Sequence, residues 1–100
     1  MRRQTLTFDR ESAELLAIDA LSFLAQAPER LQPFLALTGV SPKEIRTVAR
    51  APHFLAAVLD HIAGNEALLL EFAGESGRRP ADVMQARSRL AGAGGERDTA

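Results

Sequence analysis

The sequence FLALTGVSP at residues 34–42 returns thirty-eight residues later as FAGESGRRP at residues 72–80. Phe, Gly and Pro stand at the same places in both copies, as Phe34, Gly39 and Pro42 and again as Phe72, Gly77 and Pro80. Conservative matches follow the same offset: Leu21 with Leu59, Leu24 with Ile62, Leu31 with Leu69, Thr38 with Ser76, and Ile45 with Val83. A period of this length is typical of helical repeats, in which one unit cannot bury its apolar face alone. The chain is therefore predicted to contain two related helical units that pack on each other or on a partner.

The predicted fold is all-α, a compact bundle of five to six short helices. An alanine-rich and leucine-rich composition without Tyr or Trp suits closely packed helices better than sheets. The helices are expected over about residues 9–27, 28–38, 42–50, 52–63, 66–76 and from 80 onward. They group into two pseudo-repeated three-helix units, over about residues 9–50 and 51–90.

Local signals at the helix ends support these boundaries. Ser41, Pro42 and Glu44 have the spacing of a capping box with proline at the first helical position. Gly39 and Gly77 stand where a left-handed residue ends a helix. Side-chain caps at helix N-termini are expected from Asp9, Ser41 and Asn65.

A chain of 100 residues suffices for one domain with an ordinary core. We expect an N-terminal extension over residues 1–8, a single helical domain over residues 9–91, and a disordered tail over residues 92–100, which is small and polar with three glycines. The start of the chain has no apolar signal segment, and its apolar runs, such as 67–70, are too short to span a bilayer. A cytoplasmic protein without a membrane role is the expectation.

The segment LALTGVSPKEIRTV at residues 35–48 looks like the turn of a helix-turn-helix DNA reader. A glycine lies between two helices, and an aliphatic residue follows six positions later. Leu35 departs from the pattern, because a small residue usually stands four positions before the glycine. The basic side chains that could contact nucleic acid are Lys43, Arg46, Arg50, Arg78 and Arg79.

The same segment also fits a tight connection between any two helices, with basic residues on a solvated face. The net charge of −1 argues against strong phosphate binding. Residues 51–77 contain no Lys or Arg and four acids: Asp60, Glu66, Glu71 and Glu75. Nucleic-acid binding is therefore the less favoured hypothesis.

The chain offers no candidate catalytic, cofactor-binding or metal-ligating residues. His53 and His61 are the only histidines, and at eight residues apart on one helix they lie about two turns from each other, too far to chelate one metal alone. The serines lack an evident base and Cys is absent, so the sequence predicts that the protein is not an enzyme. Phe34 and Phe72 are expected to anchor the core of the two units. Leu6 and Phe8 are expected to contact either the bundle or a partner.

Three stretches carry a resemblance to a known family: ALSFLAQAPERLQPFLALTGVSP, HFLAAVLDHIAGNEALLLEFA and RPADVMQARSRLAG. Together with Ile45 and Arg46 they resemble domain-of-unknown-function family three-five-seven-two, a family of small alphaproteobacterial proteins. The resemblance covers about residues 17–92 and implies an all-helical, bacterial, cytoplasmic protein. It carries over no functional residue, because the family has no assigned activity.

From the repeat and the lack of catalytic residues, the sequence predicts a non-catalytic protein-interaction module. It would bind an unknown protein partner or associate with itself, and it would need no cofactor. The alternative is a helix-turn-helix-like DNA-binding protein that uses the helix at residues 42–50.

Overall fold

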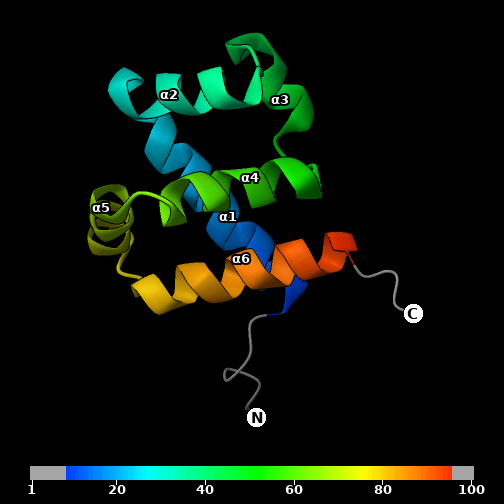
Figure 1. The fold of residues 1–100 in the computed structure, drawn as a ribbon, viewed down its shortest axis with the longest axis vertical. Coiled ribbons are helices and arrows are strands. Elements are labelled where there is room, and N and C mark those ends of the chain that lie inside the picture. The colour runs from blue at the N-terminus through cyan, green and yellow to red at the C-terminus, as the bar shows by residue number, and fades with distance from the viewer. Residues whose placement is uncertain (1–8, 96–100) are drawn as a thin grey trace.

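The computed structural model describes the backbone of residues 9–95 and the side chains of residues 9–91. Within this range the chain forms α-helices and one 3₁₀ turn, and no β-strand (Figure 1). The helices are α1 (Arg10–Ala25), α2 (Pro28–Thr38), α3 (Ile45–Val48), α4 (Pro52–Ala63), α5 (Glu66–Ser76) and α6 (Pro80–Gly95), and the 3₁₀ turn η2 (Pro42–Glu44) directly precedes α3. The all-α prediction is confirmed for the described residues.

Two of the predicted side-chain caps are present. Asp9 Oδ1 accepts a hydrogen bond from the Ser12 backbone N–H at 2.8 Å, at the start of α1. Asn65 Oδ1 accepts one from the Leu68 N–H at 3.1 Å, at the start of α5. Each cap satisfies a backbone donor that has no partner within its helix, so α1 and α5 begin where the sequence predicts.

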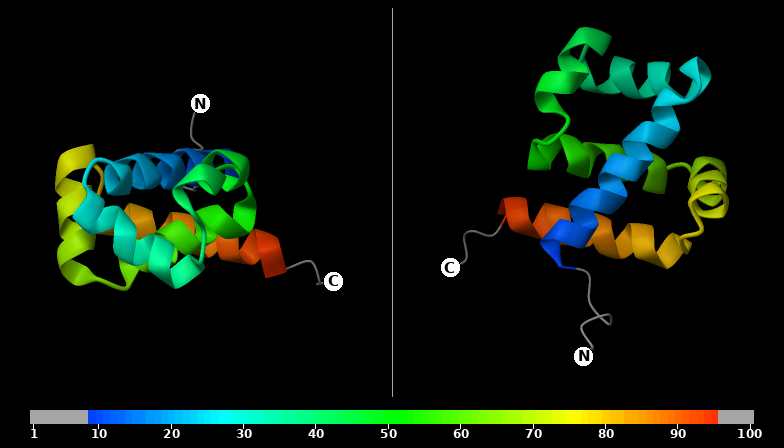
Figure 2. Two further views of the ribbon diagram at one scale, coloured as in Figure 1. Left: turned by 90° about the horizontal axis from the view of Figure 1, so that it is seen from above. Right: turned by 180° about the vertical axis from the view of Figure 1, so that it is seen from behind.

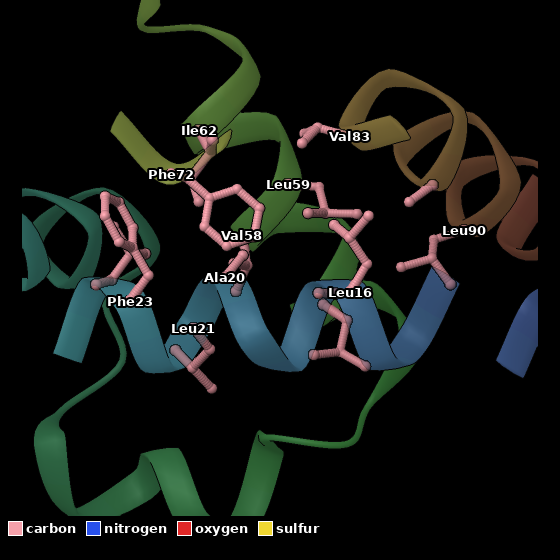
Figure 3. Close-up of a cluster of buried hydrophobic side chains, with 14 of the residues drawn as sticks. Leu16, Ala20, Leu21, Phe23, Val58, Leu59, Ile62, Phe72, Val83 and Leu90 are labelled. Atoms are coloured by element: carbon pink, nitrogen blue, oxygen red, sulfur yellow. The ribbon is translucent and has the colours of Figure 1, made fainter. Parts of the chain in front are cut away.

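Helices α1, α4 and α6 form most of the core. Helices α4 and α6 lie side by side, and α1 crosses both of them on one face (Figures 1 and 2). Leu16 of α1, Leu59 of α4 and Leu90 of α6 meet where the three helices pack together (Figure 3). Burying one such side chain contributes about 1.5–3 kcal/mol of hydrophobic stabilisation, so this contact opposes a substantial part of the entropy cost of folding. Every buried side chain among the described residues is apolar.

The second helix of each predicted unit and the turn after it match closely. Helices α2 and α5 have eleven residues each and begin and end at the same places in the repeat. Gly39 and Gly77 follow them with φ angles of 75° and 73°, the left-handed conformation that favours glycine. The Thr38 hydroxyl donates to the Phe34 carbonyl at 3.1 Å, and the Ser76 hydroxyl makes the equivalent bond to residue 72 at 2.7 Å. The repeat therefore describes local structure correctly up to the glycine turn.

The third helices of the two units differ. Helix α6 packs against both α1 and α4, and Val83 is fully buried. The equivalent Ile45 is only partly buried, and neither η2 nor α3 contributes a fully buried side chain. The two units thus share one helix and the turn after it, while their origin by duplication stays a prediction.

The helix expected over residues 42–50 begins at Pro42 as predicted, but it is irregular and ends earlier. The chain makes a single 3₁₀ turn and then a four-residue helix that ends at Val48. The Ser41 N–H donates to the Glu44 carboxylate at 2.9 Å, so one bond of the predicted capping box forms. Pro52 limits the length of the segment. Neither η2 nor α3 has a fully buried side chain that would stabilise a longer regular helix, so only a short helix results.

The ends of the chain partly lie outside the described residues. Helix α6 continues to Gly95, four residues into the segment expected as a tail. The remaining expected tail, 96–100, and the extension 1–8 with Leu6 and Phe8 lie outside the part that the structure describes.

Phe34 attaches α2 to α4 and is the one fully buried side chain between residues 28 and 51. Its ring centroid lies 5.5 Å from that of Phe54 and 5.3 Å from that of His61. Burial lowers the pKa of His61 below its ordinary value of 6.5, because the charged imidazolium loses hydration there. The attachment of α2 therefore favours the neutral form of this histidine.

We expect the free energy of unfolding to fall as the pH decreases from about 7.5 to about 5. The unfolded chain binds a proton at His61 near the ordinary pKa of 6.5, whereas the folded chain binds it only at lower pH, so acid favours unfolding in this window. Urea unfolding at both pH values measures the effect. His61→Phe should remove this part of the pH dependence, and His53→Gln, on the exposed side of α4, should retain it. An unchanged pH dependence in His61→Phe would contradict the assignment.

Candidate functional site

A shallow cleft between α1 and α5, here called the α1–α5 cleft, is a candidate site in the described part of the chain. It has a volume of about 240 Å³ and is lined by Asp19, Ser22 and Phe23 of α1, by Gln26 directly after α1, and by Phe72, Glu75 and Ser76 of α5. The first four of these residues follow the spacing i, i+3, i+4 and i+7, which places them on one face of a helix. The α5 residues follow i, i+3 and i+4 in the same way. Two helix faces thus meet to form the cleft.

Two aromatic rings form the floor of the cleft. The centroids of Phe23 and Phe72 lie 5.4 Å apart with the ring planes tilted by 59°, a favourable arrangement for an aromatic pair. Both rings are almost fully buried, and they lie next to each other above the C-terminal half of α1 (Figure 3). The floor is therefore apolar, closely packed and almost covered, while the side chains of the walls are polar.

Arg30 of α2 closes one end of the cleft. Its Nη1 donates to the Phe23 carbonyl oxygen at 3.2 Å, and its Nη2 lies 3.4 Å from Glu75 Oε2 and 3.6 Å from Glu71 Oε2. The guanidinium also lies over the Phe23 ring, 4.1 Å from the ring centroid. Only 18% of the Arg30 side chain is exposed, so this one residue connects α1, α2 and α5.

Arg78, in the turn between α5 and α6, holds the other wall. Its Nη2 donates to Asp19 Oδ2 at 2.7 Å and so joins the turn to α1. An exposed pair of this kind contributes about 0–1 kcal/mol to stability. Its larger effect is to fix the position of the Asp19 carboxylate at the cleft.

The lining of the cleft presents hydrogen-bond acceptors and no basic side chain. Asp19 and Glu75 each use one carboxylate oxygen for an arginine, and among residues 9–95 the other oxygen has no hydrogen-bond partner. The Ser76 hydroxyl donates to the Phe72 carbonyl, so its own oxygen can still accept a bond. Such an arrangement can bind a donor or a cation.

The five basic residues singled out for nucleic acid do not come together. Lys43, Arg46 and Arg50 are exposed on and after η2 and α3, which together are shorter than a helix that reads a DNA groove. Arg78 and Arg79 lie in the α5–α6 turn, at the opposite end of the molecule (Figures 1 and 2).

Both arginines of that turn are paired with carboxylates. Arg78 is bonded to Asp19, and Arg79 donates to Asp82 Oδ1 at 3.0 Å. The hydrogen bonds from Arg79 lower the pKa of the Asp82 carboxyl below its ordinary range. These contacts give Arg78 and Arg79 a local role that sequence analysis missed.

Sequence analysis also missed Arg30 and Asp19. The available signal was that polar residues of α1 have the spacing of one helix face. Their partners, however, lie far away in the sequence. Glu71 and Glu75, interpreted as a solvated face, are the acids that Arg30 holds.

Other kinds of site find little support in the described residues. No group of three His, Asp or Glu side chains among residues 9–95 is arranged to hold a metal ion. His61 packs on Phe34, and His53 lies two turns away on α4. None of the described helices is both long and apolar enough to cross a membrane.

Comparison with known proteins identifies a family. The model of the family described as "Protein of unknown function (DUF3572)" matches residues 10–93, and the chain belongs to this family. No curated protein and no solved structure matches the chain.

Proposed function

We propose that this member of the DUF3572 family is a non-catalytic protein-interaction module of the cytoplasm, and that its α1–α5 cleft receives a side chain of a partner protein. The observation that carries the proposal is the cleft itself, with a closely packed aromatic floor and polar walls bonded to Arg30 and Arg78. Preorganised groups of this kind bind without the cost of ordering them first.

The size of the cleft supports a side chain as its occupant. Pockets for small molecules and cofactors usually enclose about 300–1,000 Å³, and this cleft has about 240 Å³. Its wall residues Asp19 and Glu75 are about half exposed, so the cleft opens to solvent along its length. A side chain that projects from a larger surface can fill such a cleft, while the surrounding surface supplies the rest of the contact.

An exposed apolar side chain lies next to the cleft on α1. Leu15 precedes Asp19 by one helical turn, lies on the same face of α1 and is 56% exposed. An exposed leucine beside a polar cleft resembles the mixture of apolar and polar contacts at protein interfaces. This face of α1 is the surface on which the partner is expected to lie.

Photo-cross-linking tests the proposal. A photoreactive amino acid is placed at Gln26 in the cleft and, as a matched control, at Gln85, exposed on α6. In cells of the source organism, position 26 should give one discrete adduct with another protein, and position 85 should not. Absence of an adduct at position 26, or the same adducts at both positions, would contradict a role for the cleft in partner binding.

The DNA-binding alternative stays a prediction with weaker support. Its first candidate helix is one 3₁₀ turn and four α-helical residues, and two of its five basic residues are held by Asp19 and Asp82. The net charge of −1 adds no general attraction to phosphate.

A further inference from the structure

We propose that the protein associates with copies of itself head to tail, so that the basic end of one molecule binds the acidic end of the next. The basic end lies on and beside α2, η2 and α3 and consists of Leu37, Lys43, Arg46 and Arg50. The acidic end is the outer face of α5 and consists of Glu66, Ala67, Leu70, Glu71 and Gly74. Helix α5 lies at the opposite end of the molecule from η2 and α3 (Figure 2). The inference goes beyond the proposed function, because none of these residues lines the α1–α5 cleft.

The basic end carries cations that have no acidic partner within the described chain. Lys43, Arg46 and Arg50 are exposed, and their spacing of i, i+3 and i+7 places them on one side of the segment. None of the three forms an ion pair with another described residue. The one acid of this segment, Glu44, accepts the hydrogen bond from the Ser41 N–H. The segment therefore presents an excess of positive charge to solvent.

An exposed apolar surface adjoins these cations. Leu37, in the last turn of α2, is 76% exposed, and Pro33 and Ala36 on the same helix are exposed as well. Residues 31–42 contain no charged side chain. Contacts with DNA phosphates do not bury a leucine, whereas a protein surface does, so this end is suited to a protein rather than to nucleic acid.

The acidic end has complementary properties. Helix α5 carries three glutamates and no basic residue. Glu71 and Glu75 share the single guanidinium of Arg30, of which only 18% is exposed, and Glu66 forms no ion pair with another described residue. Leu70 is 55% exposed on the same helix. Each end thus combines an exposed leucine with charges of one sign, and the signs are opposite.

The outer face of α5 also permits close approach of another molecule. Ala67 and Gly74 lie three residues before and four residues after Leu70, on the same side of the helix. A Cβ atom at Gly74 would meet nothing within 4 Å, so packing within the described chain gives no reason for a glycine in mid-helix, where alanine is more favourable. A second molecule that packs on this face supplies a reason.

The distribution of charge favours a head-to-tail contact over a symmetric dimer. In a two-fold dimer the same face of both copies meets, so cations would face cations or acids would face acids. A net charge of −1 produces little repulsion between whole molecules. Because each molecule in a head-to-tail contact keeps one end available, association continues beyond the dimer.

Sedimentation equilibrium of the full chain tests the inference. At about 50 mM salt the weight-average mass should rise with protein concentration and pass that of a dimer, with a dissociation constant on the order of 100 µM. At about 500 mM salt the association should weaken at least about tenfold. A monomer mass up to about 1 mM protein, or association that salt does not weaken, would overturn the inference.

Two variants, each with one altered end, identify the surfaces. Lys43→Glu with Arg46→Glu reverses the basic end, and Glu66→Lys with Leu70→Lys reverses the acidic end. Each variant alone should associate at least about tenfold more weakly than the unmodified protein. An equimolar mixture should recover association, because it contains one unmodified basic end and one unmodified acidic end. Undiminished association of either variant alone, or no recovery in the mixture, would contradict the head-to-tail contact.

Gly74→Gln tests the same surface without a change of charge. Its Cβ meets no atom of the described chain and glutamine favours a helix, so the Tm should not fall, while the added bulk should weaken association at least about tenfold. The control is Gln85→Glu with Arg89→Glu, midway along α6, which should associate like the unmodified protein. If the control weakens association as much as the variants at the two ends, general charge is responsible and the inference is wrong.

Duplex DNA is the competing partner for the basic end. Fluorescence anisotropy of a labelled mixed-sequence duplex should show no binding that depends on Lys43 and Arg46. If Lys43→Glu with Arg46→Glu abolishes DNA binding, and the unmodified protein sediments as a monomer, the basic end serves nucleic acid and the inference is refuted.

Discussion

Replacing Phe72 by alanine is expected to lower the free energy of unfolding by about 3–5 kcal/mol. The ring is 1% exposed and packs against Phe23, so its removal leaves a cavity between α5 and α1 in addition to the lost apolar burial. Domains of this size are stable by only about 5–15 kcal/mol, and the change removes a large part of that margin. Chemical denaturation followed by circular dichroism measures it as a lower midpoint of one cooperative transition.

Leu70→Ala is the matched control for Phe72→Ala. It removes an apolar side chain from the same helix, but this side chain is 55% exposed, and its loss should change stability by no more than about 0.5 kcal/mol. If both variants lose the same stability, the packing of α5 described above is incorrect.

Replacing Phe34 by alanine, at the equivalent place in the repeat, should have a different result. We expect α2, η2 and α3 to detach locally, because Phe34 is the one fully buried side chain that this segment contributes. A loss of about 3 kcal/mol corresponds to amide exchange roughly a hundredfold faster over residues 28–50, whereas α1, α4 and α6 should keep most of their protection. Hydrogen exchange followed by NMR separates this local opening from global unfolding.

The control for Phe34→Ala is Leu37→Ala, on the same helix and 76% exposed. Exchange in this variant should match that of the unmodified protein within about a factor of two, since a change at an exposed side chain usually costs under about 0.5 kcal/mol. Uniformly faster exchange in all helices of Phe34→Ala would show that the α2–α3 segment and the core unfold as one unit.

Sequence patterns predicted the parts of the fold that local interactions determine. Gly39 and Gly77 end their helices because glycine adopts a positive φ without strain. Asp9 and Asn65 cap the N-termini of the helices that begin directly after them. These signals need only neighbours within one turn, so they can be read without the tertiary structure.

The third helix of each unit could not be predicted in the same way. Ile45 and Val83 have the same place in the repeat and similar chemistry, yet Val83 is fully buried in a helix that packs on α1 and α4, whereas Ile45 packs against the core and is only partly buried. Short helices are marginal without such packing, and periodicity does not show which one receives it. The helix over residues 42–50 is short and irregular because its side chains are not fully buried against other helices.

The cleft was hidden from sequence analysis for a related reason. Arg30 and Glu75 are 45 residues apart, and Arg78 and Asp19 are 59 residues apart, so their pairing depends on how α5 lies against α1. The sequence could show that Asp19 and Gln26 share a helix face, but not what that face would meet.

The position of Arg30 has a thermodynamic consequence for the molecule as a whole. Its guanidinium belongs to α2 but is bonded to the backbone of α1 and to a carboxylate of α5. A ligand that binds the other oxygen of Glu75 uses a carboxylate that Arg30 holds in place, so detachment of α2 removes this preorganisation and weakens binding. Linked equilibria are reciprocal, so occupancy of the cleft and the docking of α2 share one coupling free energy of positive cooperativity.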